Sequence, residues 1–265
     1  MKNLNYHNPV LLQEAIAFLA VQPGKRYIDC TLGGGGHTAE IIRRGGLVLG
    51  LDQDPEALSA CPELEGLTKV QSNFIHLSEV AKKYNWYPVS GILFDLGVSS
   101  HQINSSQRGF SFQTDGPLDM RMDKSLPNTA ADLVNQLPVS QLAILFKDFG
   151  EIPVAKMLAE KIISTRPLST TMDLAKITKK WSQQAFQALR MAVNDELNAL
   201  KSGLPQAYEL LEPSGRLVVI SFHSLEDRVV KQSFKSLADQ KLVTILTPKP
   251  VIGTKNAKLR ALSKI

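Results

Sequence analysis

The chain has 265 residues, of which 43% are hydrophobic, enough for one large α/β domain or one such domain carrying an insert. Its apolar runs are far too short to span a bilayer and its N-terminus has no secretory hydrophobic stretch, so we expect a cytoplasmic protein with no membrane partner. Two cysteines and five scattered histidines form no metal-ligand spacing, which predicts reduced thiols and no bound metal.

The formal net charge of +5 is unevenly distributed. Residues 228–265 contain nine Lys or Arg against a single Asp, a net charge of 9 − 1 = +8, so the rest of the chain carries 5 − 8 = −3. A basic segment of this kind fits a polyanionic partner such as nucleic acid, and it fits a solvated tail equally well.

The predicted elements begin with a helix over 9–19, whose apolar residues recur at helical spacing. The run 6–10, at the start of that helix, is a candidate border of a ligand site. The next elements are a strand over 27–31, a glycine loop over 33–36, a helix over 37–44 and a strand over 47–51.

The glycine loop is the most informative stretch. Glycines leave room for a ligand against the backbone, and the first N–H groups of the following helix point at it. The loop lacks the Gly-Lys-Ser/Thr ending of a triphosphate site, and Thr38 stands where a dinucleotide site needs its third glycine. Asp29 lies four places before Gly33, which resembles the first motif of class I S-adenosylmethionine-dependent methyltransferases. A purely structural turn is the alternative.

Two further strands are predicted over 69–71 and 89–94, with a helix over 76–84 between them. This alternation of strands and helices predicts a parallel, doubly wound α/β sheet. Ligands in such sheets bind at the carboxyl ends of the strands.

The side chains at these strand ends are therefore candidates for ligand contacts. Asp29, Asp52 and Asp95 each end a predicted strand, and three carboxylates at one edge are hard to explain by packing. Asp52 suits the two hydroxyls of a ribose. Phe74 follows the third strand, where it either covers an adenine or packs in the core.

The pattern changes after the fourth strand. A long polar run rich in glycine and charge contains aromatic residues that argue against disorder, and three helical patterns follow it. We therefore predict that residues 104–184 form an inserted helical subdomain, while residues 1–103 and 185–265 form the main domain.

The main domain is predicted to resume with a long helix over 185–211, bent near Gly203 and Pro205. A fifth strand is predicted over 216–222, and Ser224 is predicted to cap the following helix. The last predicted strand covers 242–246.

A series of short motifs runs along the chain in a characteristic order: Asp29 to His37, Asp52 to Pro55, Asp95 to Ser100, Arg108 to Phe112, Asp115 to Met122, Phe186 to Arg190 and Ser221 to Arg228. Together these motifs resemble the MraW/RsmH family over nearly the whole chain. Each motif is modest alone, but the ordered set is highly specific.

The resemblance implies a class I, Rossmann-like methyltransferase sheet whose helical insert recognises the substrate. It also implies an enzyme that uses S-adenosylmethionine to methylate the N4 amine of one cytidine in small-subunit ribosomal RNA, at the decoding centre. The substrate is the RNA or the small ribosomal subunit, and a homodimer is left open. The family's cofactor positions carry over to Gly35, Gly36, His37, Asp52, Phe74, Asp95 and Gln102.

Three residues are candidates for catalysis. We expect Asp95 to bridge the cofactor and the amine, and Ser221 and His223 to line the base pocket, although His223 fits a helix cap equally well. The target base must leave its stack to react. No aromatic residue stands directly after the fourth strand, at 96–98. The candidates for the side chain on which the target base stacks are therefore Phe110, Phe112 and Phe222.

The sequence leaves other interpretations open. A non-catalytic RNA-binding or ribosome-assembly factor on the same fold is disfavoured by the intact glycine loop and its acids. A nicotinamide-dependent oxidoreductase is disfavoured by Thr38 and by the basic segment. The charged residues Asp115, Asp119 and Arg121 fit RNA contacts, but they also fit ion pairs that lock the insert.

Overall fold

The structure is a computed structural model that describes residues 9–265, so residues 6–8 of the predicted ligand-site border lie outside the described residues. The chain divides into two compact units. The first combines the residues up to Gly97 with Leu197–Ile265, and the second is Val98–Glu196.

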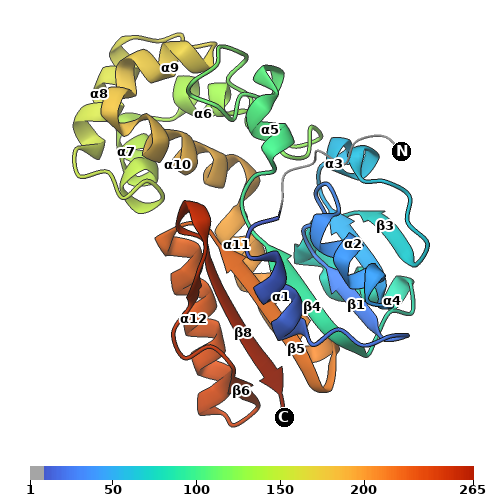
Figure 1. Cartoon of the computed structure of the whole chain (residues 1–265). Coiled ribbons are helices and arrows are strands. Elements are labelled where there is room, and N and C mark those ends of the chain that lie inside the picture. The colour runs from blue at the N-terminus through green and yellow to red at the C-terminus, as the bar shows by residue number, and fades with distance from the viewer. Residues whose placement is uncertain (1–8) are drawn as a thin grey trace. The chain divides into compact units, whose positions relative to one another are not determined.

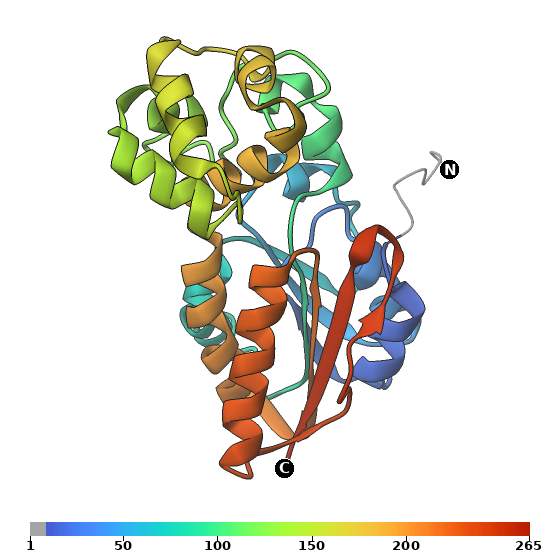
Figure 2. The ribbon, with the colours of Figure 1, turned by 90° about the vertical axis from the view of Figure 1, so that its left-hand side faces the viewer.

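A twisted sheet in the order β3-β2-β1-β4-β5-β8-β6 forms the centre of the first unit, and β7 pairs with β8 outside this path (Figures 1 and 2). Strands β1 to β5 pair in parallel, whereas β8 is antiparallel to β5, β6 and β7. The predicted α/β class and its parallel sheet are therefore confirmed. The strands are β1 (Arg26–Asp29), β2 (Leu47–Asp52), β3 (Leu67–Gln71), β4 (Val89–Asp95), β5 (Leu211–Ser221), β6 (Val243–Ile245), β7 (Val251–Ile252) and β8 (Lys258–Lys264).

Helices cover both faces of this sheet, because alternate strand residues point to opposite sides. One apolar cluster packs α1 and α2 against the sheet, and a second packs α4, α11 and α12 against the other face. The helices are α1 (Leu12–Leu19), α2 (Gly36–Arg43), α3 (Pro55–Ala60), α4 (Leu77–Lys83), α11 (Glu196–Leu210) and α12 (Ser224–Asp239).

The second unit is helical and has an apolar core of its own. Asp119 and Arg121 form a two-pronged ion pair within it, with nitrogen–oxygen distances of 2.8 and 3.0 Å, and Arg121 also donates to the carbonyls of Lys124 and Leu126. These contacts favour the insert-locking interpretation. The helices are α5 (Ser100–Asn104), α6 (Ala130–Gln136), α7 (Val139–Asp148), α8 (Ala155–Ser164), α9 (Thr171–Thr178) and α10 (Ser182–Asn194).

The predicted helix over 185–211 is in fact two helices, α10 and α11, separated at Asp195. Asp195 has a φ of +49°, which ends α10 in the left-handed region. Helix α10 packs in the core of the second unit, and its Asn194 bonds to the main chain of Met120 and Met122. The structural boundary therefore lies beyond the predicted residue 184. Gly203 and Pro205, where a bend was predicted, both lie inside α11.

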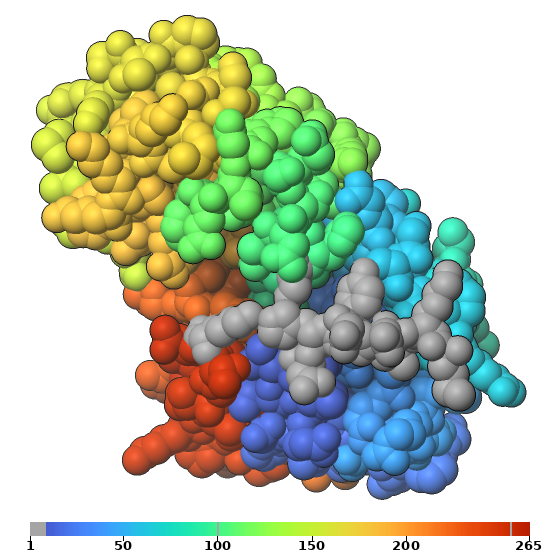
Figure 3. Space-filling model, turned by 45° about the horizontal axis from the view of Figure 1, so that its top comes forward, coloured from blue at the N-terminus to red at the C-terminus, as the bar shows by residue number. Residues whose placement is uncertain are grey.

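The basic C-terminal segment, red in Figures 1 and 3, is not a tail, because it supplies β6, β7 and β8 to the sheet. Sequence reasoning missed β8, whose charged side chains have partners within the fold. Arg260 Nε lies 2.6 Å from Asp227 Oδ1, and Lys264 donates to the Leu211 carbonyl at 2.9 Å. Other cations of the segment are exposed, namely Lys231, Lys235, Lys241 and Lys249. No helix of the described residues is long and apolar enough to cross a membrane.

Candidate active site

The turn after β1 is held by Asp29. This side chain is 1% exposed, and its two oxygens accept the Thr31 N–H at 3.1 Å and the Thr38 hydroxyl at 2.8 Å. Burial raises the pKa of Asp29 to about 6, while these hydrogen bonds oppose the rise. Asp29 thus joins the end of β1 to the start of α2, so one of the three strand-end carboxylates is explained by the loop itself.

Two glycines of the loop, Gly35 and Gly36, pack closely against other parts of the protein. Gly35 has a φ of +78°, and a Cβ added there would lie 2.6 Å from Cys61 Sγ. A Cβ on Gly36 would lie 2.3 Å from Cγ of Pro9. The loop therefore lies tightly between Pro9 and Cys61, and His37 follows it in the first turn of α2.

Asp52 connects the end of β2 to the same loop. Its Oδ2 accepts the Gly33 N–H at 2.8 Å, and its Oδ1 accepts the Asp54 N–H at 2.9 Å. Burial raises the pKa of Asp52 to about 6, so the carboxylate is mainly ionised at neutral pH. Each oxygen keeps a lone pair for a further donor, as recognition of sugar hydroxyls requires.

Asp95, at the end of β4, lies beside His37. The Asp95 Oδ2 is 3.5 Å from His37 Nδ1, whereas Asp95 Oδ1 and His37 Nε2 are buried with no hydrogen-bond partner among the described residues. Burial raises the pKa of Asp95 to about 8, helped by the charges of Asp29 and Glu226, and burial lowers the pKa of His37 to about 4. Near neutral pH a largely protonated carboxyl thus faces a neutral imidazole.

Two unpaired polar atoms at the carboxyl ends of a sheet need an explanation. The Asp95 side chain is 25% exposed as a whole, although its Oδ1 is itself buried. A ligand that donates to Asp95 Oδ1 and pairs with His37 Nε2 would satisfy both atoms. These two atoms mark the candidate site.

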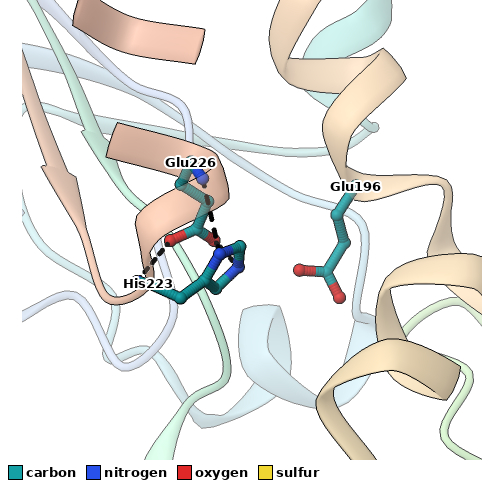
Figure 4. Close-up of side chains that lie close together, drawn as sticks. All are labelled: Glu196, His223 and Glu226. Atoms are coloured by element: carbon teal, nitrogen blue, oxygen red, sulfur yellow. Dashed lines mark hydrogen bonds and ion pairs between the residues drawn. The ribbon is translucent and has the colours of Figure 1, made fainter. Parts of the chain in front are cut away.

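His223 is the N-cap of α12, as Figure 4 shows. Its Nδ1 accepts the Glu226 N–H at 3.4 Å and Glu226 Oε2 accepts the His223 N–H at 3.4 Å, which together form a capping box. The same Oε2 also accepts the Phe222 N–H at 2.8 Å. The predicted cap at Ser224 is therefore wrong by one residue, and the cap interpretation of His223 matches the geometry. Glu196, also drawn in Figure 4, belongs to the second unit, where it pairs with Arg190 at 2.7 Å.

Ser221, at the end of β5, is a buried residue. It is 2% exposed, and its hydroxyl donates to the Lys258 carbonyl at 3.3 Å, which fastens β5 to β8. The hydroxyl group thus has a structural role at the junction with a strand that was not predicted, and the expectation that Ser221 lines a base pocket stays a prediction.

The other two predicted cofactor residues lie in different units. Phe74 is half-buried in the first unit, with its ring edge-to-face on Phe94 at 5.3 Å. Gln102 is a buried residue of the second unit, where its Oε1 accepts the Ser99 N–H in the capping box of α5. The Phe74 ring thus has a packing role in the first unit, and the Gln102 side chain has a capping role in the second.

Comparisons with known proteins agree with this architecture. The family model described as the MraW methylase family matches residues 5–264. A protein of Symbiobacterium thermophilum named Ribosomal RNA small subunit methyltransferase H is 47% identical over 252 residues, covering 86% of this chain and 79% of that protein. A protein of Heliobacterium modesticaldum with the same name is 40% identical over 309 residues, covering 98% and 99%.

A crystal structure described as a putative rRNA-methylase from Clostridium thermocellum has a TM-score of 0.53 with this chain at 15% identity, covering 98% and 99% of the two chains. This similarity concerns the fold. The parallel sheet, the glycine loop and the strand-end acids define the Rossmann-like methyltransferase class. Within that class, the chain belongs to the MraW methylase family.

Proposed function

We propose that this protein transfers a methyl group from S-adenosylmethionine to the N4 amine of one cytidine in small-subunit ribosomal RNA, at the decoding centre. Family membership and relatives named Ribosomal RNA small subunit methyltransferase H support the reaction class and the RNA. The observation that carries the proposal is Asp95, whose buried, unpaired Oδ1 ends β4 beside the glycine loop.

The residues at the strand ends fit the proposed cofactor. Asp52 is mainly ionised and keeps acceptor capacity for ribose hydroxyls, while the unpaired His37 Nε2 offers a polar contact nearby. When bound, S-adenosylmethionine supplies an electrophilic methyl group. The residues that we propose to hold it are Gly35, Gly36, His37, Asp52, Phe74, Asp95 and Gln102.

The chain's task in this reaction is to position a weak nucleophile. The lone pair of the cytosine amine is delocalised into the ring, so orientation supplies much of the rate. Asp95 Oδ1 accepts a hydrogen bond from that amine once its own proton has left, and it receives the amine proton as transfer proceeds. Ser221 and His223 support the pocket, Ser221 by fastening β5 to β8 and His223 by capping α12.

We further propose that the second unit, Val98–Glu196, recognises the RNA. Its position in the chain, between β4 and the helix that leads to β5, attaches it at the carboxyl end of β4, where Asp95 lies. A homodimer stays a prediction, which light scattering on the purified protein tests.

Replacing Asp52 by Asn tests the cofactor site. Asn keeps the size of the side chain but presents an amide group to one of two main-chain N–H donors, Gly33 or Asp54. We expect the dissociation constant for S-adenosylmethionine to rise about tenfold or more in calorimetric titration. Asp239→Asn is the matched control, because Asp239 is exposed at the end of α12, and equal affinities of the two variants would contradict the assignment.

The methyl transfer is tested directly with labelled S-adenosylmethionine and small ribosomal subunits from a strain that lacks this enzyme. We expect one methyl group per subunit, and mass spectrometry should locate it on the N4 amine of a cytidine at the decoding centre. Cofactor binding without transfer would instead favour the alternative function, a non-catalytic RNA-binding or ribosome-assembly factor.

A further inference from the structure

The proposed reaction needs a surface on which the extruded base can stack, and the loop after β4 does not supply one. A base that leaves its helix loses stacking on both faces, and enzymes replace it with aromatic or apolar side chains. The residues after Asp95 are Leu96, Gly97 and Val98, none of them aromatic. The stacking surface must therefore come from another element.

Two of the aromatic candidates serve the core of the second unit. Phe110 is buried in that core, and the Arg108 guanidinium lies 5.7 Å from its ring centre. Phe112 packs edge-to-face on Phe186 with 5.8 Å between ring centres. Contacts within the second unit therefore explain both aromatic side chains without a ligand.

Phe222 has a different environment. It directly follows β5, is half-buried, and packs on the apolar cluster that includes α1 and the adjoining strands. A Cβ added to Gly97 would lie 3.4 Å from Phe222 Cδ2. Since Gly97 has a φ of +96° and comes two residues after Asp95, the ring borders the loop at the end of β4.

The main chain of Phe222 is held by a buried carboxylate. Glu226 is 2% exposed, and its Oε2 accepts the Phe222 N–H at 2.8 Å (Figure 4 shows the Glu226 carboxylate). A charged acceptor makes this hydrogen bond stronger than a neutral one. The turn that presents the ring is thereby tied to the first turn of α12.

We propose that Phe222 is the stacking surface for the pyrimidine base of the target nucleotide, and that Glu226 is the residue that positions it. This inference rests on the proposed methyl transfer to RNA and names the residue that receives the base. It places the ring against the loop of Asp95, the residue proposed to contact the amine of that base.

Steady-state kinetics of Phe222→Leu test the proposal. Leu keeps an apolar side chain and removes the aromatic face, so we expect KM for small subunits to rise ten- to hundredfold, with a smaller change in kcat. Phe222→Tyr should stay within a few-fold of the original protein, and the calorimetric dissociation constant for S-adenosylmethionine should not change in either variant. Tyr84→Leu is the matched control, because Tyr84 is a 39% exposed aromatic residue at the end of α4.

An unchanged KM for Phe222→Leu would overturn the inference while leaving the proposed function intact. An original protein that transfers no methyl group would instead overturn the proposed function. The two failures are therefore distinguishable within one set of assays.

A photochemical measurement reports on stacking without turnover. Small subunits assembled with 5-iodocytidine in their RNA are bound to the protein and irradiated, since halogenated pyrimidines cross-link to the aromatic rings on which they stack. We expect the peptide that contains Phe222 to carry the nucleotide. A cross-link to the peptide that contains Phe110 and Phe112 would overturn the proposal.

Glu226 is tested by comparing Ala with Gln. Glu226→Ala should raise KM for small subunits. Gln keeps an oxygen acceptor for the Phe222 N–H, so Glu226→Gln should show little of this rise. Because Glu226 is proposed to act through Phe222, the effects of Glu226→Ala and Phe222→Leu on KM should not add in the double variant. Full additivity would assign Glu226 a general structural role and overturn this part of the proposal.

Discussion

Asp95→Asn should reduce methyl transfer at least a hundredfold and, at alkaline pH, stabilise the cofactor-free protein. The loss of activity is expected because Asn cannot take the proton of the amine, and a positioned acceptor of this kind typically contributes a hundredfold or more. The gain in stability is expected because the native fold holds this carboxyl where its charge is unfavourable, as the pKa raised to about 8 indicates.

The sign of the stability effect follows from proton binding. Between pH 3.8, the ordinary pKa, and about 8, the folded protein binds a proton at Asp95 that the unfolded chain has lost. The free energy of unfolding contributed by this group is therefore fully present below pH 3.8 and is lost as pH rises through about 8. Asn has no such dependence, so its advantage should grow over this window to the order of a few kcal/mol.

Urea denaturation of both proteins at about pH 5 and about pH 9 measures this difference. Asp239→Asn, on the exposed end of α12, is the control, and it should show no comparable growth with pH. An advantage of Asp95→Asn that is equal at the two pH values would contradict the raised pKa. In the original protein, kcat/KM should rise with pH through an apparent pKa near 8, because the ionised form accepts from the amine.

Gly35→Ala should weaken binding of S-adenosylmethionine at least tenfold and destabilise the protein by about 2 to 4 kcal/mol. Part of this cost is backbone strain at a φ of +78°, and part is the overlap of the new Cβ with Cys61 Sγ, 2.6 Å away. Calorimetric titration and urea denaturation measure the two effects.

A second pair of variants separates strain from overlap. Gly24 has a φ of +74° with no atom within 4 Å of an added Cβ, so Gly24→Ala reports the strain alone. Cys61→Ala removes the sulfur, so the double variant with Gly35→Ala should recover the part of the loss that exceeds the Gly24→Ala value. If Gly35→Ala costs no more than Gly24→Ala, the close packing of the loop on Cys61 is refuted.

The local elements were largely predictable from the sequence. Strands β1 to β4 lie within two residues of their predicted ranges, and α4 covers Leu77–Lys83, where a helix over 76–84 is predicted. The reason is that hydrophobic periodicity, turn residues and caps act over a few neighbouring residues. The place of the candidate site was predictable for the same reason. Asp52 and Asp95 each end a strand, and a parallel sheet brings such strand ends to one edge.

The elements that were missed depend on distant partners. Strand β8 contains Lys258, Arg260 and Lys264, which suggest a solvated segment. In the fold, Asp227 forms ion pairs with Lys258 and Arg260, and the carbonyl of Leu211 accepts a hydrogen bond from Lys264. Helix α10 has an apolar face that suits either unit, and its packing in the insert is decided by contacts such as that between Asn194 and the main chain of Met120. No local pattern encodes such pairings.

The sequence by itself thus determined the order of strands and helices, the glycine loop and the identity of the strand-end acids, because these depend on short-range stereochemistry. Only the tertiary structure decided how those acids differ. Asp29 is paired within the loop, Asp52 holds two main-chain N–H groups, and Asp95 is left with an unpaired oxygen and a raised pKa. The difference arises because burial and the charges of neighbouring elements act through space, where residues far apart in the chain meet.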